Sequence, residues 1–128
     1  MGAGLALQIK RRYPSVYNDY ISECNTTHYL LGSKICTLTN DNRICISMFT
    51  QDGYGTCKCY TDYKAFKVCL DSIANELNWL DPDGTDEIAF PYGIGCGLAG
   101  GDWNIIESLL EEFSNKIKTK VIIVKKNI

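Results

Sequence analysis

The stretch FPYGIGCGLAGGDW, residues 90–103, joins a short apolar segment at 87–90 to an amphipathic helix predicted to begin at about Trp103. Five glycines fall within nine residues, at positions 93, 95, 97, 100 and 101. Glycine leaves backbone N–H groups uncovered by side chains, and the positive end of a helix dipole follows directly. Such a loop suits phosphate, although the glycines could serve only as turn residues. We expect an anionic ligand, a nucleotide derivative.

The rest of the chain predicts alternating helices and strands. Apolar residues spaced three to four apart indicate helices, and β-branched or aromatic runs bounded by polar turns indicate strands. The predicted helices cover residues 3–12, 15–24, 61–78 and a segment from about Trp103, and the predicted strands cover 34–39, 43–50, 86–90 and 121–124. The turn at 40–42 makes the first two strands an antiparallel hairpin, and Asp-Pro-Asp-Gly at 81–84 forms another turn.

This order of elements predicts one α/β domain over residues 1–128, with a mixed sheet covered by helices on both faces. The strand at 43–50 is nearly continuous in apolar residues, so we expect it to be central. We expect the strand at 121–124 to be fully buried. The side chains expected on buried helix faces are Val16, Tyr17, Tyr20, Ile21, Phe66, Leu70, Ile73, Leu77, Ile105, Ile106, Leu109, Leu110 and Phe113.

Composition excludes several classes of function. The net charge of −2 argues against a general nucleic-acid binder, because such proteins neutralise phosphates with a basic face. No apolar run approaches the ~20 residues that span a bilayer, so we expect no membrane association. Seven cysteines without framework spacing indicate reduced thiols in the cytoplasm. Cys57-Lys58-Cys59 lacks a second pair and His28 is the only histidine, so neither a metal site nor another cofactor is expected.

Two segments together resemble the macro domain family: MGAGLALQIKRRYP at residues 1–14 and FPYGIGCGLAGGDW at 90–103. The middle of the chain, ISMFTQDGYG at 46–55 and YTDYKAF at 60–66, is similar to the same proteins. The resemblance covers nearly all of the chain in order. It is closest to the branch of small ADP-ribose 1''-phosphate phosphatases and related ADP-ribosyl-group hydrolases. It implies a three-layer α/β/α sandwich with a mixed sheet, in agreement with the predicted elements.

The resemblance also implies a ligand site for ADP-ribose or its 1''-phosphate. In this family one glycine loop approaches the distal ribose, and a second wraps the diphosphate with backbone N–H groups. The residues that these roles fall on are Gly2, Ala3 and Gly4 for the ribose, and Ile94, Gly95, Cys96, Gly97, Leu98, Ala99 and Gly100 for the diphosphate. Phe49 or Tyr54 is expected to pack near the ligand.

The chain departs from the family pattern in two respects. Complete macro domains begin with roughly two further strands, which carry a segment that reads adenine and an asparagine-rich segment beside the distal ribose. Neither segment occurs in this sequence, so we expect an N-terminally shortened domain. The branch that removes ADP-ribose from protein through a lysine adduct places that lysine where this chain has Gln51 and Asp52, and the matching aspartate position is Ala99. The lysine route is therefore not expected.

Asp102 is the candidate catalytic residue. A carboxylate beside a phosphate loop can position or deprotonate a water molecule for attack on a terminal phosphate. The alternative is that Asp102 only caps the helix that follows, since aspartate is a favourable N-cap. Cys96 lies near the same helix start, but no histidine is near it in the sequence, so a cysteine nucleophile is not expected.

These features leave several hypotheses about function. The leading hypothesis is an ADP-ribose 1''-phosphate phosphatase, which uses both glycine loops and Asp102. The alternatives are a non-catalytic ADP-ribose-binding module or an ADP-ribosyl-group hydrolase, and a degenerate domain with neither property. The sequence leaves the oligomeric state open, including a dimer that pairs exposed strand edges.

Overall fold

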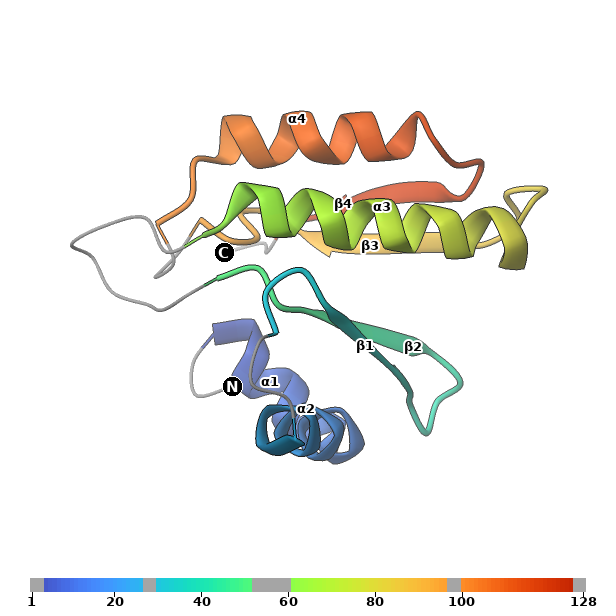
Figure 1. The fold of residues 1–128 in the computed structure, drawn as a ribbon. Helices are drawn as coiled ribbons and strands as arrows, with labels where there is room; N and C mark the ends of the chain where they lie inside the picture. The colour runs from blue at the N-terminus through green and yellow to red at the C-terminus, as the bar shows by residue number, and fades with distance from the viewer. Residues whose placement is uncertain (1–3, 27–29, 52–60, 97–99, 126–128) are drawn as a thin grey trace.

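The computed structural model describes residues 4–26, 30–51, 61–96 and 100–125. The elements follow the predicted order of helices and strands (Figure 1). They are α1 (Gly4–Arg12), α2 (Pro14–Thr26), β1 (Lys34–Leu38), β2 (Ile44–Met48), α3 (Tyr63–Leu80), β3 (Glu87–Pro91), α4 (Trp103–Ser114) and β4 (Lys120–Val124). Within this part of the chain, no helix is both long enough and apolar enough to cross a membrane.

The helices lie on both sides of the strands. In Figure 1, α3 and α4 cover one side, and α1 and α2 lie on the other. β1 and β2 form the predicted antiparallel hairpin, with Lys34 opposite Met48 and Leu38 opposite Ile44. β3 and β4 pair in parallel, from Glu87 opposite Lys120 onward. The predicted α/β class, with helices on both faces of the strands, is confirmed. Among the described residues the strands form two separate two-stranded sheets, one antiparallel and one parallel, where the sequence predicted one mixed sheet.

The position predicted for two strands is wrong. Among the described residues β2 pairs only with β1, so it is not central, and β2 and β3 each have one edge without a strand partner. Ile44 is 64% exposed, at the outer end of the hairpin. β4 is not fully buried either, because Ile123 and Val124 are exposed. A run of apolar residues indicates that a segment tends to form a strand, but it does not indicate how many neighbouring helices and strands cover that strand.

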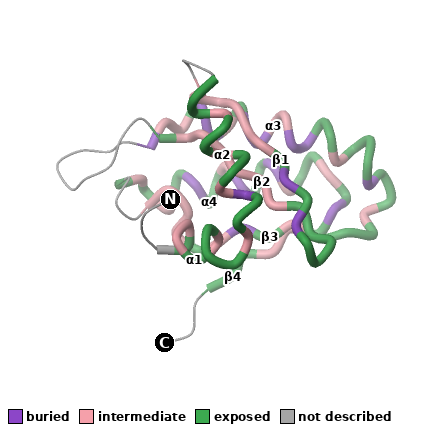
Figure 2. Tube along the Cα trace, turned by 90° about the horizontal axis from the view of Figure 1, so that it is seen from below, coloured by how far each residue is buried: buried purple, intermediate pink, exposed green. Residues whose placement is uncertain are grey.

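The main core lies where α3 and α4 pack on β3. Its buried residues are Phe66, Leu70, Ile73 and Ala74 from α3, Phe90 from β3, and Ile106, Leu110 and Phe113 from α4. Figure 2 shows buried positions recurring along α3 between exposed ones, as expected for an amphipathic helix. Two predicted core residues are exposed instead, Ile105 at 41% and Ile21 at 38%. Both lie at the margin of the apolar stripe on their helices.

A second contact joins α2 to the hairpin. Val16 is buried there, and the hydroxyl of Thr37 donates a 2.7 Å hydrogen bond to Asp19. The rings of Tyr20 and Phe49 stack with centroids 5.5 Å apart. Burial raises the pKa of the Tyr20 hydroxyl, and the nearby Cys24 raises it further. The hairpin is thereby held against α2, while α3 covers its other side.

The predicted turn at 81–84 is confirmed and ties three elements together. Asp81 is 4% exposed and accepts hydrogen bonds from Thr85, from the Asp86 amide and from the Thr119 hydroxyl, the last at 2.6 Å. Gly84 has a φ of +72°, and a Cβ there would lie 2.3 Å from the Lys118 carbonyl oxygen. The end of α3 is therefore fixed to the starts of both β3 and β4.

Asp81 should make stability depend on pH. The Thr119 hydroxyl, followed by the Thr85 and Asp86 donors, lowers the pKa of Asp81 below its ordinary value. The contribution of the ionised Asp81 side chain to the free energy of unfolding is therefore fully present above its unfolded-state pKa of about 3.9. This contribution is lost as the pH falls through the lower pKa of the folded state. We predict that Asp81→Asn lowers the free energy of unfolding at pH 7 and flattens its decline below pH about 4. Urea unfolding at several pH values measures this effect.

The matched control is Asp83→Asn, in the exposed part of the same turn. Asp83→Asn should leave both the stability at pH 7 and its acid dependence close to those of the wild type. Equal behaviour of the two variants would contradict the role of Asp81.

Candidate functional site

The described part of the predicted phosphate loop lies at the end of the molecule where β3 and β4 finish. β3 and β4 run parallel, so their carboxyl ends meet at the same edge. The starts of α3 and α4 lie at this end as well (Figure 1). In α/β proteins, ligands commonly bind outside the carboxyl ends of parallel strands. The glycine loop after Pro91 leaves from this edge and ends at the first turn of α4.

Three glycines of the loop have left-handed backbones. Gly93, Gly95 and Gly100 have φ values of +77°, +76° and +74°. A side chain at such a position is strained, so the conformation itself calls for glycine. At Gly93 a Cβ would have no neighbour within 4 Å, which leaves conformation as the only constraint there.

Gly101 is needed for a different reason. Its N–H donates a 2.9 Å hydrogen bond to the carbonyl of Gly95, so the two ends of the loop meet. A Cβ at Gly101 would lie 2.5 Å from that carbonyl oxygen and 3.1 Å from Oγ1 of Thr61. The Thr61 hydroxyl donates to the same oxygen at 2.5 Å. The Gly95 carbonyl thus closes the base of the loop.

Several amides of the loop already have partners inside the protein. The Ile94 amide donates to Pro91 and the Cys96 amide to Gly93, at 3.1 and 2.9 Å. The amides of Gly93, Gly95 and Gly100 have no partner among the described residues. The described amides of Gly93, Gly95 and Gly100 can therefore bind a ligand without breaking a hydrogen bond inside the protein, whereas the Gly101 amide cannot. Gly97, Leu98 and Ala99 lie outside the described residues.

Asp102 is the N-cap of α4, as the capping alternative predicted. Its backbone is extended, with φ −88° and ψ 119°, and its Oδ1 accepts from the Asn104 amide at 2.9 Å. Its own amide donates to the hydroxyl of Tyr63 at 2.9 Å. The carboxylate is exposed, and Oδ2 has no partner among the described residues. Capping therefore occupies one carboxylate oxygen and leaves the other facing solvent beside the loop.

Aromatic rings flank the loop where it leaves β3. The rings of Tyr92 and Trp103 lie 4.7 Å apart, tilted by 50°, and Nζ of Lys125 lies 4.8 Å from the centre of the Tyr92 ring. The Trp103 indole N–H donates to Glu107 at 2.9 Å. These contacts join the ends of β3 and β4 to the first turns of α4.

The remaining predicted site residues are only partly described. Gly4 begins α1, which lies on the opposite side of the strands from α4 (Figure 1), and Gly2 and Ala3 lie outside the described residues. Cys96 is half-buried, and its Sγ lies 3.5 Å from the Ile94 carbonyl. Phe49 packs on Tyr20 as described above, and Tyr54 is outside the described part. Asp52, one of the positions compared with the lysine route, is outside it too.

Sequence reasoning missed Thr61 and Tyr63. Tyr63 is the first residue of α3 and Thr61 lies two residues before it. Both are far from the loop in sequence, and both contact it through hydroxyl groups. The only signal was that they fall within YTDYKAF, residues 60–66, one of the segments that resemble macro domains. That resemblance does not say which side chains contact the loop.

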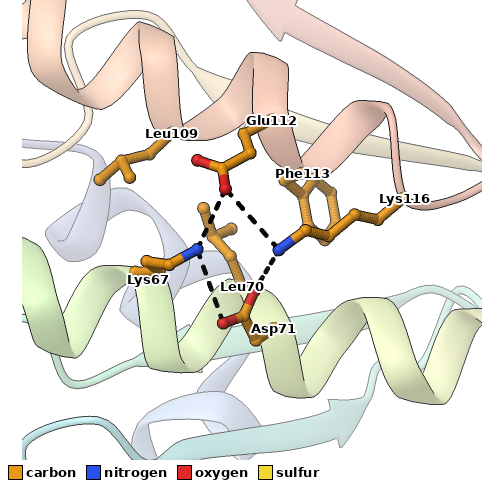
Figure 3. Close-up of a pocket in the computed structure, with 7 residues that line it drawn as sticks. All are labelled: Lys67, Leu70, Asp71, Leu109, Glu112, Phe113 and Lys116. Carbon is orange, nitrogen blue, oxygen red and sulfur yellow. Dashed lines mark hydrogen bonds and ion pairs between the residues drawn. The ribbon is translucent and has the colours of Figure 1, made fainter.

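A hollow between α3 and α4 lies away from this site. Figure 3 shows the side chains that line it, which are the charged Lys67, Asp71, Glu112 and Lys116 and the apolar Leu70, Leu109 and Phe113. Lys67 pairs with Glu112 at 3.2 Å and Lys116 with Asp71 at 2.9 Å. The Lys116 hydrogen bond lowers the pKa of Asp71, and the same bond raises the pKa of Lys116. These opposite charges pair with one another, so the side chains around the hollow connect α3 to the end of α4.

In the described part of the chain, no group of three His, Cys, Asp or Glu side chains is placed to hold a metal ion.

The close contact at Gly101 gives a stability prediction. Gly101→Ala should push the loop base apart and lower the free energy of unfolding by about 1–3 kcal/mol, the usual cost of overpacking. Gly93→Asn is the matched control, because its Cβ has open space and asparagine tolerates a left-handed backbone. Thermal unfolding measures both variants. A larger loss for Gly93→Asn than for Gly101→Ala would contradict the closed loop base.

No family model matches the sequence. The ADP-ribose 1''-phosphate phosphatase of Candida albicans (strain SC5314 / ATCC MYA-2876) is 26% identical over 130 residues, which cover 89% of this chain and 74% of that protein.

Solved structures are similar over nearly the whole chain. The macrodomain of Mycobacterium tuberculosis DarG has a TM-score of 0.80 at 22% identity, over 100% of this chain and 82% of that chain. Thermosipho africanus DarTG, solved in complex with ADP-ribose, has a TM-score of 0.75 at 22% identity, over 98% of this chain and 35% of that chain. The resemblance to macro domains is thereby confirmed, and this chain has the macrodomain fold.

Proposed function

We propose that this protein binds ADP-ribose and hydrolyses ADP-ribose 1''-phosphate to ADP-ribose and phosphate. The observation that carries the proposal is the glycine loop that ends at Asp102, the N-cap of α4. The Candida albicans relative bears the name of this phosphatase, and the Thermosipho africanus structure contains ADP-ribose. A cytoplasmic location, predicted from the cysteines, belongs to the same proposal.

The binding half of the proposal uses the loop at 94–100. The amides of Gly95 and Gly100 lack partners among the described residues and can donate to phosphate oxygens. The start of α4 adds the favourable end of its dipole for a negative ligand. The family resemblance assigns the diphosphate to this loop and the distal ribose to Gly2, Ala3 and Gly4.

The catalytic half uses the solvent-facing oxygen of Asp102. This carboxylate oxygen accepts a proton from a water molecule as that water attacks the phosphorus of the 1''-phosphate. The bond between phosphorus and the 1''-oxygen breaks, phosphate leaves, and the 1''-oxygen takes a proton from solvent. A positioned general base of this kind contributes typically about 10²–10⁴-fold in rate. The Asn104 hydrogen bond to Oδ1 fixes the direction in which Oδ2 points.

The alternative is an ADP-ribose-binding module without turnover. It is favoured by the exposure of Asp102 and by its complete structural role as a helix cap. An ADP-ribosyl-group hydrolase acting through a lysine adduct is not favoured, because the compared positions hold Gln51, Asp52 and Ala99. Binding and turnover must therefore be measured separately.

Asp102→Asn separates capping from catalysis. Asparagine caps helices about as well as aspartate but cannot accept the proton. We predict unchanged thermal stability, an ADP-ribose affinity within about threefold of the wild type, and phosphate release from ADP-ribose 1''-phosphate slower by about 10²–10⁴-fold. Calorimetry with ADP-ribose and a phosphate-release assay measure the two properties.

The outcomes distinguish the candidate functions. Release at the wild-type rate by Asp102→Asn would remove Asp102 from the mechanism. Binding of ADP-ribose by the wild type without any phosphate release would support the binding module. Absence of ADP-ribose binding by the wild type would overturn both.

A further inference from the structure

The residues before and at the start of α3 form a rigid segment. Asp62 caps α3 by accepting from the Ala65 amide at 2.9 Å, and its own amide donates to the Thr50 carbonyl at 2.7 Å. Thr61 forms an antiparallel bridge with Gln51. The segment at 61–63 is therefore held by both its own helix and the chain that follows β2.

Two hydroxyl groups of this segment contact opposite ends of the glycine loop. Thr61, 6% exposed, donates to the Gly95 carbonyl at 2.5 Å. The Tyr63 hydroxyl accepts from the Asp102 amide at 2.9 Å. The first bond holds the entry to the loop, and the second holds the residue that ends it.

We propose that Thr61 and Tyr63 are positioning residues, which set the geometry of the glycine loop and of Asp102 for the proposed reaction. The inference rests on the proposed function, because it assigns what these hydroxyls contribute to that same site. Neither residue is assigned contact with the ligand. Each acts through one hydrogen bond to the backbone of the loop.

Thr61 acts on binding. The Gly95 carbonyl accepts from both Gly101 and Thr61, and these two bonds hold Gly95 in its left-handed conformation. Loss of the Thr61 hydroxyl leaves one donor on this oxygen, so the peptide planes on either side of Gly95 gain freedom. The unpartnered Gly95 amide is then less well aimed at a phosphate oxygen.

Tyr63 acts on turnover. Its ring packs against the core formed by α3, α4 and β3, so its hydroxyl is a fixed point. The bond from the Asp102 amide to this hydroxyl holds the N-cap residue in place, and Asn104 fixes its carboxylate. Without the hydroxyl, Asp102 keeps its charge, its cap and the bonds to its carbonyl, but loses the hydrogen bond made by its own backbone amide.

The test removes each hydroxyl without changing the shape of the side chain. Thr61→Val should weaken ADP-ribose binding by about three- to tenfold, as expected for one hydrogen bond, and Thr61→Ser should restore it. Tyr63→Phe should lower kcat for phosphate release by about three- to tenfold with KM nearly unchanged. In the Asp102→Asn background, Tyr63→Phe should have no further effect on rate, because there is no base left to orient.

Matched controls lose equivalent bonds elsewhere. Thr37→Val removes a buried threonine hydroxyl bonded to Asp19 at 2.7 Å, and Tyr13→Phe removes a tyrosine hydroxyl bonded to Asp41 at 2.7 Å. Both should leave affinity and rate within twofold of the wild type. Thermal unfolding of all variants shows whether a lost activity reflects a lost fold.

The results separate failure of this inference from failure of the proposed function. A wild type that neither binds ADP-ribose nor releases phosphate would overturn the proposed function itself. The positioning roles alone would be overturned if the wild type is functional, Thr61→Val folds and binds ADP-ribose with unchanged affinity, and Tyr63→Phe has an unchanged kcat. Equal losses in Thr61→Val and Thr61→Ser, or an added loss from Tyr63→Phe in the Asp102→Asn background, would also contradict them.

Discussion

The carbonyl oxygen of Gly95 receives hydrogen bonds from the Gly101 amide and the Thr61 hydroxyl, and the geometry of the candidate site follows from this one acceptor. The bond from Gly101 closes the loop and requires a residue without a side chain at that position. The bond from Thr61 fixes the closed loop to the segment that leads into α3. A loop rich in glycine loses much conformational freedom on ordering, so these contacts offset a real entropic cost.

The rest of the fold holds the glycine loop and the start of α3 in fixed positions relative to each other. α3 and α4 pack on β3 through a shared apolar core, and the ion pairs of Lys67 and Lys116 link the exposed sides of the same helices. Asp81 ties the far end of α3 to the starts of β3 and β4. Because α3, α4 and β3 are fixed to one another at several points, Thr61 and Tyr63 meet the loop at defined positions.

The sequence predicted most elements of the fold because the signals are local. The turn at 81–84, the hairpin and the start of α4 at Trp103 each depend on residues a few positions apart. Burial of β2 and β4 was overestimated, since it depends on which elements cover a strand. The glycines at 93, 95 and 100 were recognised, but their sequence does not show which amides are already bonded. Thr61 and Tyr63 were missed for the same reason, because a contact across more than 30 residues leaves no local pattern.

The proposed function depends most on diphosphate binding by the unpartnered amides of the glycine loop. The most direct measurement is a titration of ¹⁵N-labelled protein with ADP-ribose, followed through backbone amide resonances. We predict the largest shifts at Gly95, Gly100 and the first turn of α4, with a smaller shift at Gly101, whose amide is already bonded to Gly95. Saturable binding that leaves these resonances unmoved and shifts others would contradict it.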